Sequence, residues 1–186
     1  TGLREDQENF NLELIGGDLT SSPSHITITI SIFGETRDGA FVSRTGAKNG
    51  DLLFVSGILG LAKIGLDNFN KKSKYLSIAK EKYLIPQPRV NLGLLLKNVA
   101  NSMIDISDGL VQDTTHLAMN SGLCVELDLN KIPLPNIPNI SNNSLLNAAL
   151  YGGDDYELLF SCNPNQEQYL KKISETNHIK LTNIGD

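Results

Sequence analysis

The chain has 186 residues, of which 40% are hydrophobic and 20% charged, and its formal net charge is -5 at pH 7. This length and apolar content can bury a core in one domain, or in one domain plus part of another, and they exclude a disordered tail. The acidic balance and the absence of a basic run argue against binding to nucleic acid, and the apolar stretches are too short to span a membrane. The N-terminal sequence TGLREDQENF lacks a leader pattern, so we expect a cytoplasmic protein.

The predicted elements begin with the polar stretch REDQENF, which is compatible with a helix, and with LELIGGD, which has the character of a strand end. Residues 25–34, HITITISIFG, alternate isoleucine with threonine or serine, which predicts a half-buried strand. The following connection, GETRDGAFVSRTGAKNGD, is rich in glycine and charge and predicts a domain boundary. We therefore expect residues 1–39 and 40–186 to belong to different domains.

From about Thr45 onward, stretches typical of strands and helices alternate. In chain order they are a strand in DLLFVS, helices near 74–83 and 90–99, a strand in SMIDIS, a helix in DGLVQDTTHLAMNSG, a strand in LCVELDL, a helix in SLLNAALY, a strand in YELLFSC, a helix in PNQEQYLKKISETN and a strand in IKLTNIG. This order predicts an α/β fold of the two-layer sandwich type, with a mixed sheet and helices. Cys124 and Cys162 lie in strand-like runs without paired spacing, so we expect buried, reduced thiols.

Acidic residues cluster where the predicted strand in SMIDISDGL passes into a helix. The strand period places Ile104 and Ile106 on one face and Asp105 and Ser107 on the other, and Asp108 opens the helix. Two carboxylates beside free backbone N–H groups at the start of a helix suit a phosphate and its magnesium ion. In the alternative interpretation, Ser107 or Asp108 is an ordinary helix N-cap.

Two further turns, LIGGDL and YGGDDYELLF, place carboxylates directly after paired glycines. Flexible glycines allow a ligand to approach the backbone closely, and Asp18 or Asp154 can take part in binding a hard cation or a ligand. Ordinary strand-end turns are the alternative at both places. The scattered histidines and the lack of a glycine-flanked nucleophile support neither a Ser-His-Asp nor a Cys-His arrangement.

In combination, these motifs resemble a known family. MIDISDGL, followed by IPL and then ALYGGDDYELLF, resembles the C-terminal part of thiamine-monophosphate kinase, an ATP-dependent family of the aminoimidazole ribonucleotide synthetase superfamily. LIGGDLT and VSRTGAKNGDLLFVSGILG match the same family in the same order, so the resemblance covers nearly the whole chain. It implies an enzyme that phosphorylates thiamine monophosphate to thiamine diphosphate with ATP as co-substrate and Mg²⁺ as cofactor, and that acts as a homodimer.

The resemblance also implies magnesium ligands, ATP contacts and a substrate contact. These are, respectively, Asp18, Asp105 and Asp108; Gly17, Arg44 and Ser107; and Asp154. Phosphoryl transfer between two anions is served by magnesium that bridges phosphates and by in-line positioning, for which carboxylate-rich turns are suited. The sequence departs from the family pattern at two positions, because the family usually has Glu where Asp154 stands and Asp where Leu61 stands.

The family also has an N-terminal domain with a GDDA-like acidic turn and an STD strand, and this sequence contains neither. We therefore expect residues 1–39 to be a remnant of the N-terminal ATP-binding domain, and residues 40–186 to be the C-terminal α/β domain of the kinase. We expect such a fragment to be impaired on its own and to need the missing segment. Two alternatives remain open: another ATP-using member of the superfamily, and a non-catalytic remnant that binds nucleotide or a partner chain.

Overall fold

The computed structural model describes residues 2–36 and 41–186. The chain divides into two compact units, Thr1–Glu35 and Thr36–Asp186. The domain boundary predicted after residue 39 lies outside the described residues.

The first unit contains one helix, α1 (Gly2–Phe10), which agrees with the prediction for REDQENF. Neither LELIGGD nor HITITISIFG forms a strand. The isoleucines of the second stretch are 59 to 93% exposed, and they are Ile26, Ile28, Ile30 and Ile32. A strand is defined by hydrogen bonds to a neighbouring strand, and the described part of this unit supplies no neighbour, so the alternating pattern remains unpaired.

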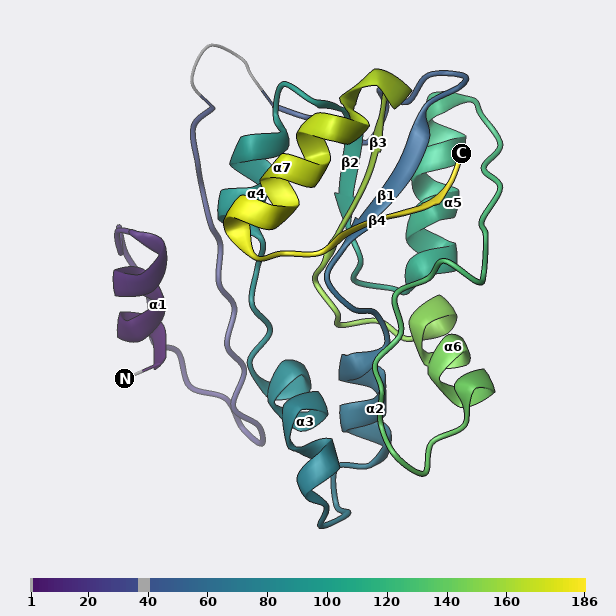
Figure 1. Cartoon of the computed structure of the whole chain (residues 1–186). Coiled ribbons are helices and arrows are strands. Elements are labelled where there is room, and N and C mark those ends of the chain that lie inside the picture. Colours follow the sequence, from purple (N-terminus) through teal and green to yellow (C-terminus); the bar gives the residue numbers. More distant parts are fainter. Residues whose placement is uncertain (1, 37–40) are drawn as a thin grey trace. The chain divides into compact units, whose positions relative to one another are not determined.

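A four-stranded sheet forms the centre of the second unit (Figure 1). Its order is β2-β3-β1-β4, and the strands are β1 (Leu52–Ser56), β2 (Ala100–Asp105), β3 (Leu158–Cys162) and β4 (Leu181–Gly185). All three strand pairings are antiparallel, so the sheet differs from the mixed sheet that the sequence predicts. The stretch LCVELDL forms no strand and joins the sheet through an isolated bridge between Leu127 and Gly185.

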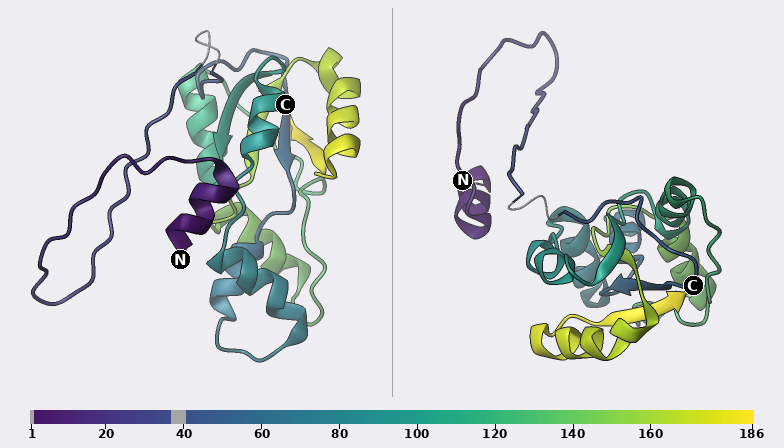
Figure 2. Two further views of the ribbon diagram at one scale, coloured as in Figure 1. Left: turned by 90° about the vertical axis from the view of Figure 1, so that its left-hand side faces the viewer. Right: turned by 90° about the horizontal axis from the view of Figure 1, so that it is seen from above.

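Helices cover both faces of the sheet, which gives three layers where two were predicted. The helices are α2 (Leu61–Asp67), α3 (Ser77–Leu84), α4 (Val90–Leu96), α5 (Leu110–Ser121), α6 (Asn142–Tyr151) and α7 (Glu167–Asn177). Helices α4 and α7 pack on one face, and α5 and α6 pack on the other; Figure 2 shows α5 and α7 on opposite sides of the sheet. The sequence patterns predicted no helix in LAKIGLD, the stretch that forms α2.

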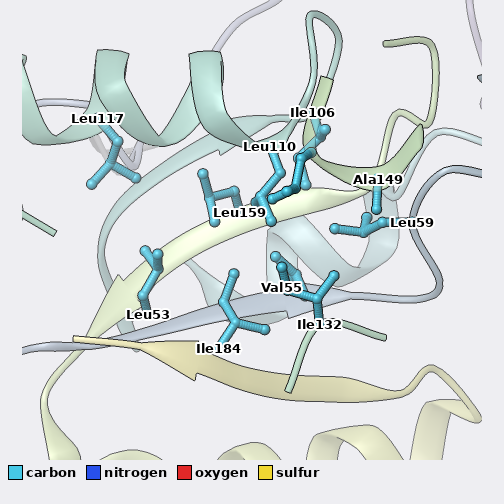
Figure 3. Packing of buried hydrophobic residues seen from close by; sticks show 11 residues of the cluster. Leu53, Val55, Leu59, Ile106, Leu110, Leu117, Ile132, Ala149, Leu159 and Ile184 are labelled. Atoms are coloured by element: carbon cyan, nitrogen blue, oxygen red, sulfur yellow. The ribbon is translucent and has the colours of Figure 1, made fainter. Parts of the chain in front are cut away.

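The third layer follows from strands that are apolar on both faces. On one face, Leu53 of β1 and Leu159 of β3 pack against Leu110 and Leu117 of α5 (Figure 3). On the other face, the rings of Phe54 and Phe160 stack with their centroids 5.7 Å apart and contact α4 and α7. Burying one such large apolar side chain contributes about 1.5 to 3 kcal/mol. The α/β class predicted from the sequence is therefore confirmed, with a core on each side of the sheet.

A third apolar cluster joins α2, α3 and α6 beyond one end of the sheet, through residues such as Ile64, Ala79 and Ala148.

Cys162 is buried and free, as predicted, and burial raises the pKa of its thiol to about 12. Cys124 is also free but exposed, which corrects the expectation that it is buried. Of the helices in the described ranges, none has both the length and the apolar character that crossing a membrane requires.

Candidate functional site

The turn between β2 and α5 carries three of the residues predicted to form a site. Strand β2 ends at Asp105, and α5 begins at Leu110. Ile106 is fully buried, whereas Asp105 and Asp108 are exposed and Ser107 is half-buried. The buried isoleucine anchors the turn in the core, and strand alternation then directs the carboxylate of Asp105 away from it.

Asp113, in the first turn of α5, fixes the backbone of this turn. Its Oδ2 accepts hydrogen bonds from the N–H groups of Ser107 and Asp108, each at 3.1 Å. The residue is 1% exposed. Burial raises the pKa of the Asp113 carboxyl, and the nearby charges of Asp108 and Asp105 act in the same direction against the two hydrogen bonds. The two N–H groups are thus occupied by a protein carboxylate, whereas the sequence interpretation left them free for a ligand.

The side chains of Ser107 and Asp108 do not cap α5. The N-cap position is Gly109, and no side-chain hydrogen bond caps the helix. Asp108 Oδ2 instead accepts a hydrogen bond from Gln112 Nε2 at 3.1 Å. The ordinary N-cap interpretation therefore does not account for the acidic residues of this turn.

The loop between α6 and β3 lies directly against the same turn. The N–H of Asp154 donates to the carbonyl oxygen of Ser107 at 3.0 Å, and the N–H of Tyr156 donates to that of Ile106 at 2.9 Å. The N–H of Ile106 in turn donates to the carbonyl oxygen of Glu157 at 2.8 Å. These bonds extend the β2–β3 pairing beyond the strands and hold Asp154 beside the β2–α5 turn.

Glycines make this close approach possible. A Cβ on Gly153 would overlap the carbonyl oxygen of Ser107, and a Cβ on Gly109 would come within 3.0 Å of the carbonyl carbon of Tyr151. Gly109 also has a φ of 112°, in a region that other residues rarely adopt. The glycines in DISDG and YGGDD are therefore required for the two segments to interlock.

The side chains of Asp154 and Tyr156 form a polar pair in this loop. Tyr156 Oη donates to Asp154 Oδ1 across 3.4 Å, and both residues have a positive φ, of 49° and 67° respectively. Burial raises the pKa of the Tyr156 hydroxyl, and the neighbouring charges of Asp154, Asp105 and Asp108 raise it further. All three carboxylates thus lie near the Tyr156 hydroxyl, and their negative charges favour a cation there.

Residues 2–36 and 41–186 contain no cluster of three or more His, Cys, Asp or Glu side chains arranged to hold a metal ion. The oxygen donors of Asp105 and Asp108 nevertheless suit Mg²⁺, which is commonly bound by one or two carboxylates together with substrate phosphates and water.

The remaining predicted residues belong to neither of these two segments. Arg44 is exposed in a turn beside β2, where the carbonyl oxygen of Ser43 accepts a hydrogen bond from the N–H of Met103 at 3.1 Å. Gly17 and Asp18 belong to the first unit, where both are exposed and outside regular structure. The second unit thus brings together Asp105, Ser107, Asp108 and Asp154, while Gly17 and Asp18 stay predictions.

Roles for Asp113, Tyr156 and Glu157 were not predicted from the sequence. Asp113 was recognisable only as an acidic residue in the first turn of a helix, which is a common feature. Tyr156 and Glu157 lie within the motif YGGDDYELLF, whose sequence does not indicate which residues their side chains bind.

The fold of the chain matches that of solved kinases. The crystal structure of thiamine-monophosphate kinase from Stenotrophomonas maltophilia K279a superposes with a TM-score of 0.76 and 32% identity, over 79% of this chain and 50% of that chain. The structure of AaThiL complexed with AMPPCP and TMP gives a TM-score of 0.66 and 32% identity, over 77% of this chain and 47% of that chain. No protein-family model matches the chain.

The sequence relationship is of similar extent. The chain is 39% identical over 183 residues to the thiamine-monophosphate kinase of Buchnera aphidicola subsp. Schizaphis graminum, which covers 95% of this chain and 56% of that protein. It thus spans about half the length of the curated relatives that it matches. In sequence and fold the chain is a relative of the thiamine-monophosphate kinases, and the resemblance inferred from its motifs is confirmed.

Proposed function

We propose that the chain forms part of an enzyme that transfers the γ-phosphoryl group of ATP to thiamine monophosphate, giving ADP and thiamine diphosphate. The observation that carries this proposal is the interlock of the β2–α5 turn with the loop of Asp154, through the 3.0 Å hydrogen bond between Asp154 and Ser107. It places residues predicted for the nucleotide and its metal beside the residue predicted for the substrate. The relative AaThiL, which was solved with AMPPCP and TMP, supports the same pair of ligands.

Each residue of the proposed site has a role that suits its surroundings. Asp105 and Asp108 would hold Mg²⁺, Ser107 and Arg44 would contact ATP, and Asp154 would contact thiamine monophosphate. The metal would neutralise phosphate charge, which is the main requirement of phosphoryl transfer between anions. The protein's part is to hold both substrates in line, and the interlocked backbone segments supply that rigidity.

Further parts of the proposal concern the first unit, the assembly and the cell compartment. Gly17 and Asp18 would contribute an ATP contact and a metal ligand. The exposed isoleucine face of residues 25–34 would pair with a second copy of the chain, giving a homodimer. An ATP-using enzyme of this kind would act in the cytoplasm, where its nucleotide is available.

The test is to measure ADP and thiamine diphosphate formed from ATP and thiamine monophosphate by a protein that contains this chain. Product should require both substrates and Mg²⁺, and should fall in Asp105→Asn. Binding of AMPPCP without any product would instead favour the non-catalytic alternative. ATP consumption only with a different acceptor would favour another ATP-using member of the superfamily.

A further inference from the structure

Two fully buried carboxylates alternate with the two site-facing residues of the loop between α6 and β3. Asp155 is 0% exposed and Glu157 is 1% exposed, whereas Asp154 and Tyr156 are partly exposed. Burying a charged group is costly unless it is paired and hydrogen-bonded. The partners of the two buried carboxylates therefore show what fixes this loop.

Glu157 is held by a bidentate contact with Arg89, which precedes α4. Arg89 Nε donates to Oε2 at 2.7 Å, and Nη2 donates to Oε1 at 2.6 Å. Ser56 Oγ at the end of β1 donates to Oε2 at 2.6 Å, and Lys82 Nζ of α3 donates to Oε1 at 3.1 Å. Burial acts to raise the pKa of Glu157, but the hydrogen bonds from Arg89 and Ser56 and the positive charges lower it overall. The carboxylate is thus ionised and held from three separate elements.

The backbone around Glu157 is shaped to receive its carboxylate. Gly57 has a φ of 65°, and a Cβ at that position would overlap the carboxyl group of Glu157. Asp155, two residues earlier, accepts hydrogen bonds from the N–H groups of Gly60 at 2.5 Å and Ala62 at 3.2 Å. The loop is consequently anchored to β1, to the start of α2 and to Arg89.

The backbone that carries these anchors is strained. Asp154 and Tyr156 adopt left-handed conformations, which cost free energy for residues other than glycine and persist only where the surroundings enforce them. A buried ion pair is by itself weak evidence for stability, because apolar residues of similar volume often replace it without loss. The Glu157–Arg89 pair is therefore better explained by the conformation that it imposes than by the stability that it adds.

We infer that Arg89, acting through Glu157, is a positioning residue that holds Asp154 and Tyr156 in the orientation required for binding thiamine monophosphate. Arg89 does not touch the substrate in this scheme. The Tyr156 hydroxyl, 3.4 Å from Asp154 Oδ1, becomes a second polar group of the substrate site. The statement about substrate rests on the proposed function, whereas the statement about loop conformation does not.

The test compares three variants with the parent chain. The double variant Arg89→Met/Glu157→Met replaces the buried pair with apolar side chains of similar length. Arg89→Lys keeps the charge but loses the bidentate geometry. Lys131→Met is the matched control, because it removes an exposed cation whose Nζ lies 3.4 Å from Asp128 Oδ2 and so pairs with a residue outside the loop. Each protein is examined by amide hydrogen exchange and by thermal unfolding. Binding is measured by titration with AMPPCP in the presence of Mg²⁺, and then by titration with thiamine monophosphate in the presence of both.

We expect exchange at the amides of Asp154 and Tyr156 to accelerate about tenfold or more in the double variant, while the amides of β1 keep the parent rates. Thiamine monophosphate should bind about tenfold more weakly, with AMPPCP affinity unchanged. Arg89→Lys should also accelerate exchange at these two amides and weaken binding of thiamine monophosphate. If the double variant does not fold, the inference is tested by Arg89→Lys alone. Lys131→Met should match the parent.

Parent-like exchange at Asp154 and Tyr156 in a folded variant would overturn the inference. So would faster exchange accompanied by parent-like binding of thiamine monophosphate, because the loop would then not need its anchors for binding. If the parent itself binds no thiamine monophosphate, the proposed function fails. The conformational part of the inference is then still decided by the exchange rates alone.

Discussion

At the scale of single residues, Asp105 and Asp108 carry charge that no other part of the described chain neutralises. Both side chains are exposed, and neither takes part in an ion pair within residues 2–36 and 41–186. Within the same described ranges, the amide of Gln112 is the one hydrogen-bond partner of the Asp108 carboxylate. Such residues contribute little to packing, so replacing either carboxylate by its amide changes charge far more than shape.

This contrast gives the first prediction. Asp105→Asn and Asp108→Asn should each lower turnover about tenfold or more in a protein that contains this chain, because each removes a carboxylate proposed to bind Mg²⁺. The free energy of unfolding should change by no more than about 0.5 kcal/mol, as expected for exposed positions. Asp154→Asn should raise KM for thiamine monophosphate more than it lowers kcat. The measurements are steady-state kinetics against each substrate and urea unfolding.

Parent-like kinetics in all three variants would show that Asp105, Asp108 and Asp154 do not form the metal and substrate site. Loss of folding in all three would instead mean that these carboxylates serve the structure.

The burial of a single side chain was predictable where it follows from the alternation along a strand. Contacts with residues distant in the sequence were not predictable. The exposure of Asp105 and the burial of Ile106 follow from alternation along β2. The contact between Arg89 and Glu157 joins positions 68 residues apart, and no local pattern indicates it. The exposed position of Cys124 could not be predicted for a similar reason, because its apolar neighbours suggested a paired strand that does not form.

At the scale of elements, the start of α2 depends on a carboxylate supplied by the loop before β3. Gly60 and Ala62, at the first turn of α2, donate their N–H groups to Asp155, and no side chain of the helix itself caps it. Because this cap comes from 93 to 95 residues away in the chain, the sequence LAKIGLD did not indicate a helix. The element exists through tertiary contacts that local propensity does not encode.

The second prediction concerns the pH dependence of this cap. Burial raises the pKa of Asp155 from 3.8 to about 6, against the lowering effect of its two backbone hydrogen bonds. Between about pH 4 and pH 6, the Asp155 carboxyl is therefore protonated in the folded state and ionised in the unfolded state. Its contribution to the free energy of unfolding is greatest below about pH 4 and is lost as the pH rises to about 6. The difference in free energy of unfolding between the parent and Asp155→Asn should fall by up to about 3 kcal/mol from pH 4 to pH 7.

Urea unfolding of both proteins at several pH values measures this difference. Ser141→Ala, which removes the side-chain cap of another helix, α6, without changing a titratable group, is the control and should give a difference from the parent that does not change with pH. A difference between the parent and Asp155→Asn that does not change with pH would contradict the prediction.

At the scale of the whole molecule, the order of elements was predictable but their arrangement was not. Most helices and strands from Leu52 onward appear where sequence patterns place them. Alternating strands and helices are also compatible with parallel crossovers, so the antiparallel order β2-β3-β1-β4 could not be derived from that pattern. The burial of Leu53 and Phe54 on opposite faces of β1 explains why helices are required on both sides.

The third prediction concerns the first unit, where residues 25–34 show the alternation of a strand without strand hydrogen bonds. Ile26, Ile28, Ile30 and Ile32 are at least 59% exposed, and the stretch contains no charged Asp, Glu, Lys or Arg residue to discourage pairing. An unpaired apolar stretch of this kind is a template for another strand. We therefore expect two copies of the chain to associate through it.

Sedimentation over a range of concentrations should show a dimer that forms as the concentration rises. Ile28→Lys/Ile30→Lys should weaken dimer formation about tenfold or more, because like charges would meet across the paired strands and apolar burial would be lost. Thr27→Lys/Thr29→Lys adds the same charge on the other face of the alternating pattern and should weaken it less. A parent chain that stays monomeric at high concentration, or a threonine variant that dissociates as readily as the isoleucine variant, would show that this isoleucine face is not what joins the two copies.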